Sequence, residues 1–151
     1  MHQITAAVVK NISLSDTIKM MVLTAPEVSA SGKPGQFVHV RAGKGVDPLL
    51  RRPFSIHGSN PDRKTISLLY RVLGKGTAYM KAANPGDSFD IIGPLGNGFC
   101  SPPGLESAVI VAGGMGIAPA LFLARELRHR NKTVHLLWGV RNAEEIIFPP
   151  D

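Results

Sequence analysis

The sequence predicts a small antiparallel β-barrel or sandwich followed by the beginning of a parallel α/β unit. Up to about residue 100, short segments of strand-like composition alternate with turns rich in glycine, proline, asparagine and aspartate. After residue 104 the pattern changes to an apolar run, a glycine-rich bend, a helical stretch and a second apolar run. The chain has 151 residues, which is enough for one good core or two small ones.

The first part contains short candidate strands that are separated by turn segments such as 31–35, 58–62 and 84–87. In 65–72 the side chains divide between two faces, as a strand requires. Strands at this spacing are typical of a small antiparallel barrel or sandwich. The predicted strands are 4–10, 18–24, 36–41, 53–57, 65–72 and 88–92.

The second part has the pattern of a βαβ unit. Residues 107–112 are apolar without alternation, which is typical of a strand buried on both faces. A glycine-rich bend follows at 113–116, then a helix from about 117 to 130 and a second buried strand at 133–139. Because sheets usually have about four to six strands, we expect this unit to be incomplete. Either the chain was truncated or another chain completes it.

The composition argues against several classes of protein. No apolar run approaches the roughly 18 residues of a membrane helix, and the N-terminus shows no secretory signal, so we expect a cytoplasmic protein that does not bind membranes. The net charge is +6, and residues 1–102 carry all of it, with 12 Lys or Arg against 6 Asp or Glu. These charges are scattered and only nine residues are aromatic, which argues against nucleic-acid binding.

The cysteine and histidine residues limit the chemistry further. Cys100 is the only cysteine, so the chain can form no intrachain disulfide and cannot alone supply the four thiolates of an iron–sulfur cluster. We expect Cys100 to be buried and unreactive. His39, His57 and His135 lie in predicted strands, and we assign none of them a catalytic role. We find no zinc-ligand spacing and no nucleophile–base–acid set, which fits a protein whose chemistry belongs to a cofactor.

Two segments of the barrel region could hold an anion. Arg52 leads the tetrapeptide 52–55, and its planar guanidinium could pair with a phosphate. Taken alone, a surface arginine before an edge strand, with Phe54 in the core, is the simpler interpretation. Residues 74–77 form a glycine-rich turn, and a short helix beginning near Thr77 would direct free amides at an anion. Taken alone, a plain turn capped by Thr77 is the simpler interpretation.

Two further segments are rich in glycine. Residues 93–99 contain three glycines and on their own predict only a loop. Residues 111–119 place a glycine-rich bend between a buried strand and a helix, which is a means of holding a pyrophosphate. The spacing differs from the GxGxxG dinucleotide fingerprint, so this bend alone is weak support for nucleotide binding.

Taken together and in this order, these segments resemble the ferredoxin–NADP reductase superfamily. The resemblance rests on RPFS at 52–55, YR at 70–71, GKGT at 74–77, GPLGNGF at 93–99 and GGMGIAP at 113–119. Within the superfamily, KPGQFVHVR, DPLLRRPFSIH and YRVLGKGT are most similar to the electron-transfer subunits of NAD-dependent dihydroorotate dehydrogenases. The similarity extends from about residue 4 to residue 148.

The resemblance implies a six-stranded antiparallel Greek-key FAD-binding barrel over residues 1–102. It also implies an incomplete Rossmann-like, parallel α/β NAD-binding domain over residues 103–151. Arg52 would pair with the FAD pyrophosphate, while Gly76 and Thr77 would bind phosphate through their backbone amides. The other residues implied to contact the flavin or the pyridine nucleotide are Pro53, Phe54, Ser55, Leu69, Tyr70, Arg71, Gly113, Gly114 and Gly116.

The resemblance further implies a subunit of pyrimidine biosynthesis that passes electrons from dihydroorotate oxidation through FAD to NAD. A partner subunit carrying FMN would oxidise dihydroorotate, in a heterotetramer, and a 2Fe-2S cluster would connect the two flavins. The four cysteines that hold this cluster in the family are absent here, so we expect no cluster on this chain.

Two alternative functions and one assembly property complete the expectations. The chain could instead be a reductase subunit of a hydrogenase, sulfide dehydrogenase or ferredoxin:NADP oxidoreductase. It could also be a basic, non-redox barrel that binds RNA or protein. Whatever the function, the parallel sheet of the second part is incomplete. The strand at 133–139 should therefore expose an unpaired edge, so we expect the isolated chain to dimerise, exchange strands or aggregate.

Overall fold

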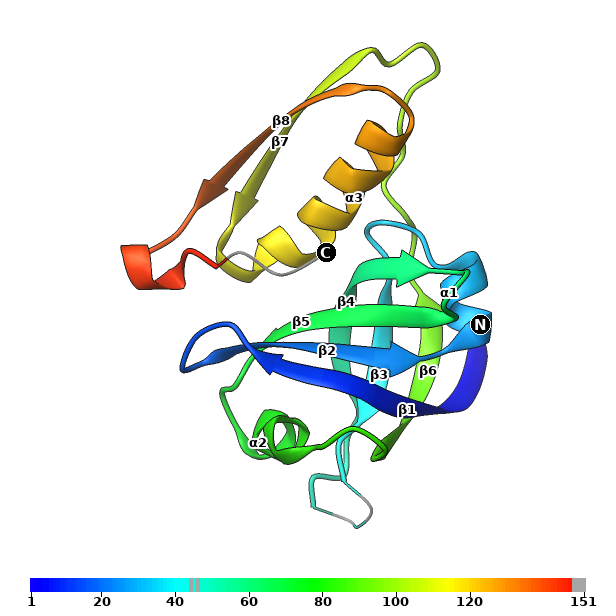
Figure 1. The fold of residues 1–151 in the computed structure, drawn as a ribbon, viewed down its shortest axis with the longest axis vertical. Coiled ribbons are helices and arrows are strands. Elements are labelled where there is room, and N and C mark those ends of the chain that lie inside the picture. The colour runs from blue at the N-terminus through cyan, green and yellow to red at the C-terminus, as the bar shows by residue number, and fades with distance from the viewer. Residues whose placement is uncertain (44, 46, 148–151) are drawn as a thin grey trace.

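The chain forms a closed β-barrel with a smaller α/β unit packed against one side of it (Figure 1). The computed structural model describes residues 1–43, 45 and 47–147. The end of the predicted second domain, residues 148–151, lies outside the described residues.

Six antiparallel strands close the barrel in the order β1-β2-β5-β4-β3-β6. Strands β2 and β3 follow one another in the chain but are not neighbours in the barrel, so the connections cross as in a Greek key. The predicted barrel is thereby confirmed, and the sandwich alternative is wrong. The strands are β1 (His2–Ser13), β2 (Ile18–Thr24), β3 (Phe37–Arg41), β4 (Arg52–Asn60), β5 (Thr65–Arg71) and β6 (Ser88–Leu95).

Several strands are longer than the sequence predicts. β1 extends beyond 4–10 in both directions because it pairs with β6 along its first half and with β2 along its second. β4 continues through 58–60, where we predict a turn, because a register shift between Ile56 and Gly58 lets it stay paired with β5. The short helix α1 (Pro26–Ser31) was not predicted.

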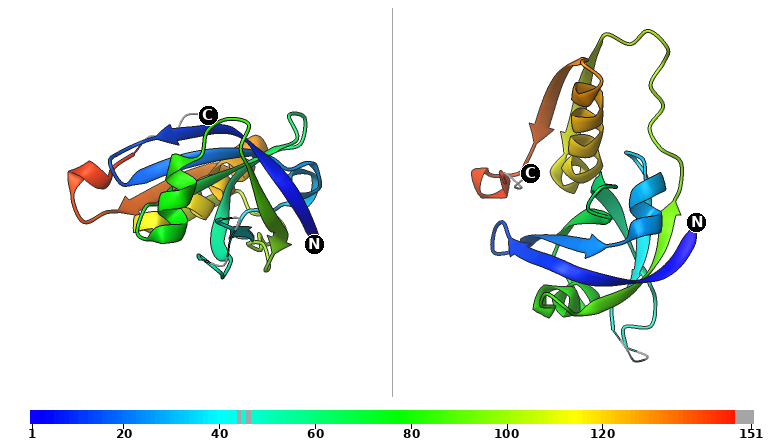
Figure 2. Two further views of the ribbon diagram at one scale, coloured as in Figure 1. Left: turned by 90° about the horizontal axis from the view of Figure 1, so that it is seen from below. Right: turned by 45° about the vertical axis from the view of Figure 1, so that its right-hand side comes forward.

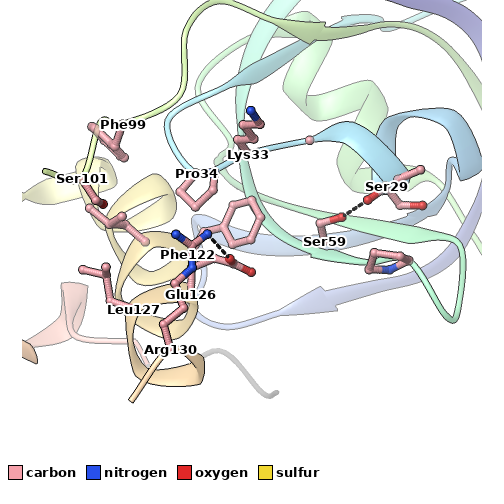
Figure 3. Close-up of a pocket in the computed structure, with 14 residues that line it drawn as sticks. Ser29, Lys33, Pro34, Ser59, Phe99, Ser101, Phe122, Glu126, Leu127 and Arg130 are labelled. Carbon is pink, nitrogen blue, oxygen red and sulfur yellow. Dashed lines mark hydrogen bonds and ion pairs between the residues drawn. The ribbon is translucent and has the colours of Figure 1, made fainter. Parts of the chain in front are cut away.

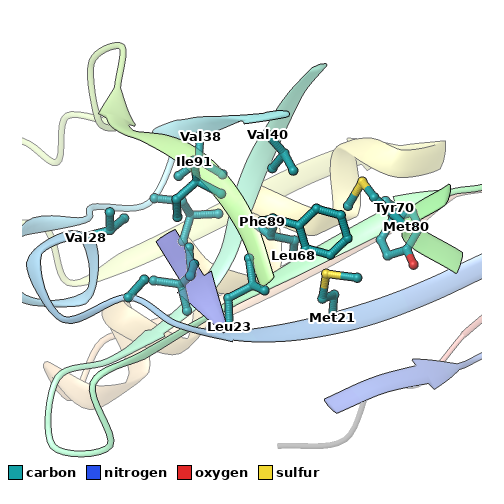
Figure 4. Close-up of a cluster of buried hydrophobic side chains, with 14 of the residues drawn as sticks. Met21, Leu23, Val28, Val38, Val40, Leu68, Tyr70, Met80, Phe89 and Ile91 are labelled. Carbon is teal, nitrogen blue, oxygen red and sulfur yellow. The ribbon is translucent and has the colours of Figure 1, made fainter. Parts of the chain in front are cut away.

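Alternate side chains of the strands fill the barrel (Figure 4). Two helices complete this core. α1 contributes Val28 and α2 (Lys75–Ala82) contributes Met80, and both side chains are fully buried. Figure 4 shows these two residues at opposite ends of the cluster, so α1 and α2 cover opposite ends of the barrel.

The second unit confirms the predicted βαβ pattern (Figure 2). β7 and β8 pair in parallel, from Ser107 opposite Thr133 to Gly113 opposite Gly139. The glycine-rich bend forms a 3₁₀ turn, η1, before the long helix. The elements are β7 (Ser107–Gly113), η1 (Gly114–Gly116), α3 (Ile117–His129), β8 (Thr133–Gly139) and η2 (Ala143–Glu145).

The prediction that both faces of β7 and β8 are buried is wrong for this structure. α3 covers one face, whereas no element of residues 1–43, 45 and 47–147 covers the other. Val109, Val111 and Leu137 on the open face are 66%, 75% and 57% exposed. Apolar side chains that are this exposed on adjacent strands mark a face suited to a further contact.

The two units share an apolar interface. Ile18, Met20 and Leu69 on the outer surface of the barrel cluster with Ala112 and Ile117 of the α/β unit. α3 also contacts β4. The interface therefore places the glycine-rich bend next to β5.

His57 is fully buried where β4 meets α3. Its Nδ1 lies 3.0 Å from the carbonyl oxygen of Ala118, and its Nε2 lies 3.5 Å from Nη1 of Arg125. Because the carbonyl can only accept, Nδ1 carries the proton and Nε2 accepts from Arg125. Burial lowers the pKa of His57 to about 4, although the bond to Ala118 opposes the shift and Arg125 reinforces it.

This lowered pKa predicts that acid destabilises the chain. In the unfolded state His57 binds a proton near pH 6.5, whereas in the folded state it does so only near pH 4. Stability is therefore full above about pH 6.5 and falls between pH 6.5 and 4. We expect His57 to account for a loss of about 2 kcal/mol between pH 7 and pH 5. Urea unfolding at both pH values checks this, and His57→Gln should reduce the pH-dependent difference by that amount.

Two further predictions concern the burial of Cys100 and membrane-spanning helices. Cys100 is exposed in the segment that joins the two units, so the prediction of a buried cysteine is wrong. Among the described residues, no helix has the length and apolar character needed to cross a membrane.

Candidate functional site

The candidate site is centred on the contact between Arg52, at the start of β4, and Gly76, in the first turn of α2. A Cβ atom on Gly76 would lie 2.8 Å from Nε and 3.2 Å from Cδ of Arg52. Only glycine at this position leaves the Arg52 side chain where it is. The segments 52–55 and 76–77, which are 20 residues or more apart in the chain, therefore meet in space as predicted.

The N-terminus of α2 differs in detail from the prediction. The helix begins at Lys75, with Gly74 as its N-cap, rather than near Thr77. The Thr77 hydroxyl accepts hydrogen bonds from the amides of Leu73 at 2.9 Å and Gly74 at 3.1 Å, and it donates to the Gly74 carbonyl at 3.0 Å. Thr77 thus holds the preceding loop, while the first-turn amides have no partner within the helix.

Three basic side chains lie near this contact, and Arg52 is the one whose charge is not paired with a carboxylate of the described residues. Arg51 is bound to Asp90 at 2.5 Å, and Lys75 to Asp47 at 2.7 Å. Arg52 contacts the carbonyl oxygen of Leu50 but forms no ion pair with any carboxylate of the described residues. The first turn of α2 contains no acidic residue, so the helix dipole adds to the charge of Arg52. Such an arrangement attracts an anion.

The other predicted residues of β4 follow Arg52 along the strand. Pro53 is exposed, whereas Phe54 and Ser55 are partly buried. The Phe54 ring packs edge-on against Tyr70, with ring centroids 5.9 Å apart. The start of β4 therefore places the partly buried Phe54 and Ser55 beside Arg52.

On β5 the predicted residues have less accessible side chains. Leu69 and Tyr70 are 3% and 2% exposed, on opposite faces of the strand. Leu69 packs against the α/β unit, and Tyr70 points into the barrel, so each can offer a ligand only its backbone. The guanidinium of Arg71 pairs with Glu145 of η2 at 2.9 Å. Its Nε is buried and has no hydrogen-bond partner among the described residues.

The three predicted glycines of the α/β unit lie at the carboxyl end of β7. Gly113 ends the strand, and Gly114 and Gly116 lie in η1, which contacts β5. Among the described residues, a Cβ on any of the three would meet no atom of a non-neighbouring residue within 4 Å. The φ of +49° explains the glycine at 114 by its backbone, whereas packing does not explain Gly113 and Gly116, and the space beside all three is open to a ligand.

Two residues that were not predicted, Asn11 and Lys19, hold the end of α2 in place. The Asn11 side-chain amide lies within hydrogen-bonding distance of three carbonyl oxygens at the end of α2, and Lys19 Nζ lies 3.4 Å from one of them. A single asparagine just after the predicted strand 4–10 gave no signal of this role.

Two cavities among the described residues are separate from this site. One of about 350 Å³ lies between the barrel and the second half of α3, beside Lys33, Phe99, Phe122 and Arg130 (Figure 3). The other, also about 350 Å³, lies beside Tyr79 and Phe89. Neither is lined by a predicted site residue, so the site is an open surface between elements.

Sequence comparison identifies the domain to which this surface belongs. The family described as "Oxidoreductase FAD-binding domain" matches residues 5–99, which include both Arg52 and Gly76. This chain belongs to that family.

Curated relatives of this FAD-binding domain carry a more specific name. A protein of Desulforamulus reducens, "Dihydroorotate dehydrogenase B (NAD(+)), electron transfer subunit", is 45% identical over 128 residues, 84% of this chain and 48% of the relative. A protein of Bacillus caldolyticus with the same name is 37% identical over 131 residues, 85% of this chain and 51% of the relative. The chain thus spans about half the length of the curated relatives it matches.

Solved structures confirm the ferredoxin-reductase-like fold. The structure of the NADH-dependent reduced ferredoxin-NADP oxidoreductase superposes with a TM-score of 0.83 at 26% identity, over 95% of this chain and 51% of that one. The ferredoxin reductase in carbazole 1,9a-dioxygenase superposes with a TM-score of 0.81 at 24% identity, over 97% of this chain and 45% of that one. The second similarity shows the fold alone.

Proposed function

We propose that this domain binds the pyrophosphate of FAD between Arg52 and the N-terminus of α2. The contact between Arg52 and Gly76 carries the proposal. It directs guanidinium and helix amides at one point on the surface, which suits the paired negative charges of a pyrophosphate. The bound flavin would supply hydride and electron transfer, while the chain would orient it and offset its charge.

The remaining contacts to FAD follow from the positions of the side chains. The backbone of Phe54 and Ser55 and the Ser55 hydroxyl would face the flavin ring from β4, and Pro53 would flank it. Leu69 and Tyr70 would contribute backbone groups, because their side chains are buried. Arg71 would reach the cofactor after its pair with Glu145 opens.

The pyridine nucleotide would bind beside the glycine bend of the α/β unit. Gly113, Gly114 and Gly116 have open space above them and would let NAD(H) approach the backbone. Because η1 contacts β5, this second site would adjoin the flavin.

We propose that the whole protein is an electron-transfer subunit that passes electrons from dihydroorotate oxidation through FAD to NAD. The names and identities of the curated relatives support this proposal. A catalytic partner subunit with FMN, in a heterotetramer, would supply the electrons. The 2Fe-2S cluster between the flavins needs thiolates that lie outside this chain, since Cys100 is its only cysteine.

An assay that compares electron donors distinguishes the dihydroorotate-linked function from the rival reductase functions. The likeness to the NADH-dependent reduced ferredoxin-NADP oxidoreductase favours a ferredoxin-linked reductase as second candidate. The full reading frame, combined with a catalytic subunit, should reduce NAD with dihydroorotate as donor. Activity with reduced ferredoxin and none with dihydroorotate would favour the rival. FAD-binding family membership weighs against the non-redox barrel.

A direct test of FAD binding needs only this chain. Titration with FAD, followed by flavin fluorescence, should saturate at one FAD per chain, and denaturation should release the flavin. A titration without saturation at any FAD concentration would contradict the proposal.

The open face of β7 and β8 supports a proposal for assembly. Val111 and Leu137 leave apolar surface on that face, and within the described part of the chain each strand leaves one edge unpaired. We expect light scattering to show dimers or larger species whose fraction rises with concentration. Substitution of Val111 and Leu137 by Lys should shift the chain to monomer, and a wild-type monomer at every concentration would contradict the expectation.

The cytoplasmic location also remains a proposal. The exposed thiol of Cys100 supports it, because free exposed cysteines are typical of reducing compartments.

A further inference from the structure

We propose that Asn11 is a positioning residue for phosphate recognition, acting from the far end of α2. This inference rests on the proposed FAD site and names a residue outside it. Asn11 lies on β1, whereas Arg52 and the first-turn amides lie on β4 and at the opposite end of the helix.

Asn11 joins α2 to the barrel core. Its Nδ2 lies 2.9 Å from the carbonyl oxygen of Met80, 3.3 Å from that of Lys81 and 2.9 Å from that of Ala83. Its Oδ1 lies 3.0 Å from the Tyr70 hydroxyl. Since carbonyl oxygens only accept, the orientation of the amide is determined: Nδ2 faces the helix, and the Tyr70 hydroxyl donates to Oδ1.

The partner of Asn11 in the core is a buried tyrosine. Tyr70 is 2% exposed, and burial raises its pKa to about 12, although its hydrogen bond to Asn11 Oδ1 opposes the shift. The hydroxyl therefore keeps its proton and remains a donor over the whole physiological range. Lys19, which is 8% exposed, adds a second contact to the Lys81 carbonyl at 3.4 Å.

These contacts fix the position of the helix N-terminus. α2 has 8 residues and is therefore only about 12 Å long, so an anchor at its last turn also sets the height and direction of its first turn. Met80 anchors the buried side of the same turn in the core. At the N-terminal end of α2, Gly76 lies so close to the Arg52 side chain that not even a Cβ would fit between them. A small tilt of α2 would therefore change the position of its first-turn amides relative to the guanidinium.

The test compares FAD with riboflavin, which has the flavin ring but no phosphate. Asn11→Leu keeps a similar side-chain volume and removes every hydrogen bond of the Asn11 side chain. We expect its dissociation constant for FAD to rise about tenfold, the equivalent of one lost charge-assisted hydrogen bond, and that for riboflavin to stay within about twofold. Equal losses for both ligands, or an unchanged affinity for FAD, would overturn the inference.

Two variants separate positioning from stability. Val28→Ala removes buried apolar contacts at the opposite end of the barrel and should destabilise the chain without changing the ratio of FAD to riboflavin affinity. If Asn11→Leu does not fold, Asn11→Ala removes the same side-chain hydrogen bonds without adding a larger apolar group, and it should lower FAD affinity about tenfold, again without affecting riboflavin. A wild-type chain that binds no FAD would refute the proposed function itself, whereas wild-type binding with an unchanged ratio in these variants would refute only the role of Asn11.

Discussion

Replacing Arg52 with alanine should raise the dissociation constant for FAD by about 10- to 100-fold. Arg52 is held against the N-terminus of α2 and has no carboxylate partner among the described residues, so its charge is available to the pyrophosphate. A charge-assisted hydrogen bond of this kind contributes about 1.5–3 kcal/mol. Isothermal titration of FAD into wild-type and variant chains measures the effect.

Arg63→Ala is the matched control for this change. Arg63 is exposed in the turn between β4 and β5, so the variant loses the same charge away from the site. We expect its FAD affinity to stay within about twofold of wild type, because surface charges at a distance are screened by salt. An Arg52→Ala chain that binds FAD as well as the control would exclude Arg52 from the site.

Replacing Gly76 with alanine should weaken FAD binding about tenfold without unfolding the chain. The added Cβ would lie 2.8 Å from Arg52 Nε, so the arginine side chain must move away from the helix amides. Alanine is the better helix former by up to about 1 kcal/mol, so thermal stability should be equal or slightly higher. FAD titration and a thermal unfolding curve on the same sample distinguish the two effects.

The control for this variant is the same substitution at Gly139. A Cβ there would meet nothing closer than 3.9 Å, and the residue lies outside the barrel. FAD affinity should be unchanged in Gly139→Ala. If Gly76→Ala lowers both the thermal stability and the FAD affinity, glycine is required at position 76 for the packing of α2 rather than for cofactor binding.

The strands of the barrel could be predicted because their local signals are strong. Side-chain alternation and turn residues locate β2, β3 and β5 within a residue or two. The closure of these strands into a barrel could not be predicted from local signals, because it depends on pairing between strands that are far apart in the chain. For the same reason the apolar runs of β7 and β8 indicated what those strands need to bury but not which element covers each face.

The candidate site was accessible to sequence reasoning only through a combination of motifs. Arg52 and Gly76 each had a simpler structural explanation, and only their order along the chain, matched to a family, predicted that they meet. The directions of Leu69 and Tyr70 were not predictable, because β5 is buried on both faces and alternation alone cannot assign them. Asn11 acts across a long sequence separation and leaves no local pattern.

A double-mutant cycle on FAD binding tests most directly whether Arg52 and the amides of α2 hold one pyrophosphate. We predict that Gly76→Ala weakens binding about tenfold in the wild-type chain but less than about twofold in a chain that already carries Arg52→Ala. Equal losses in both backgrounds would show that the two positions act independently, and would contradict a shared phosphate site.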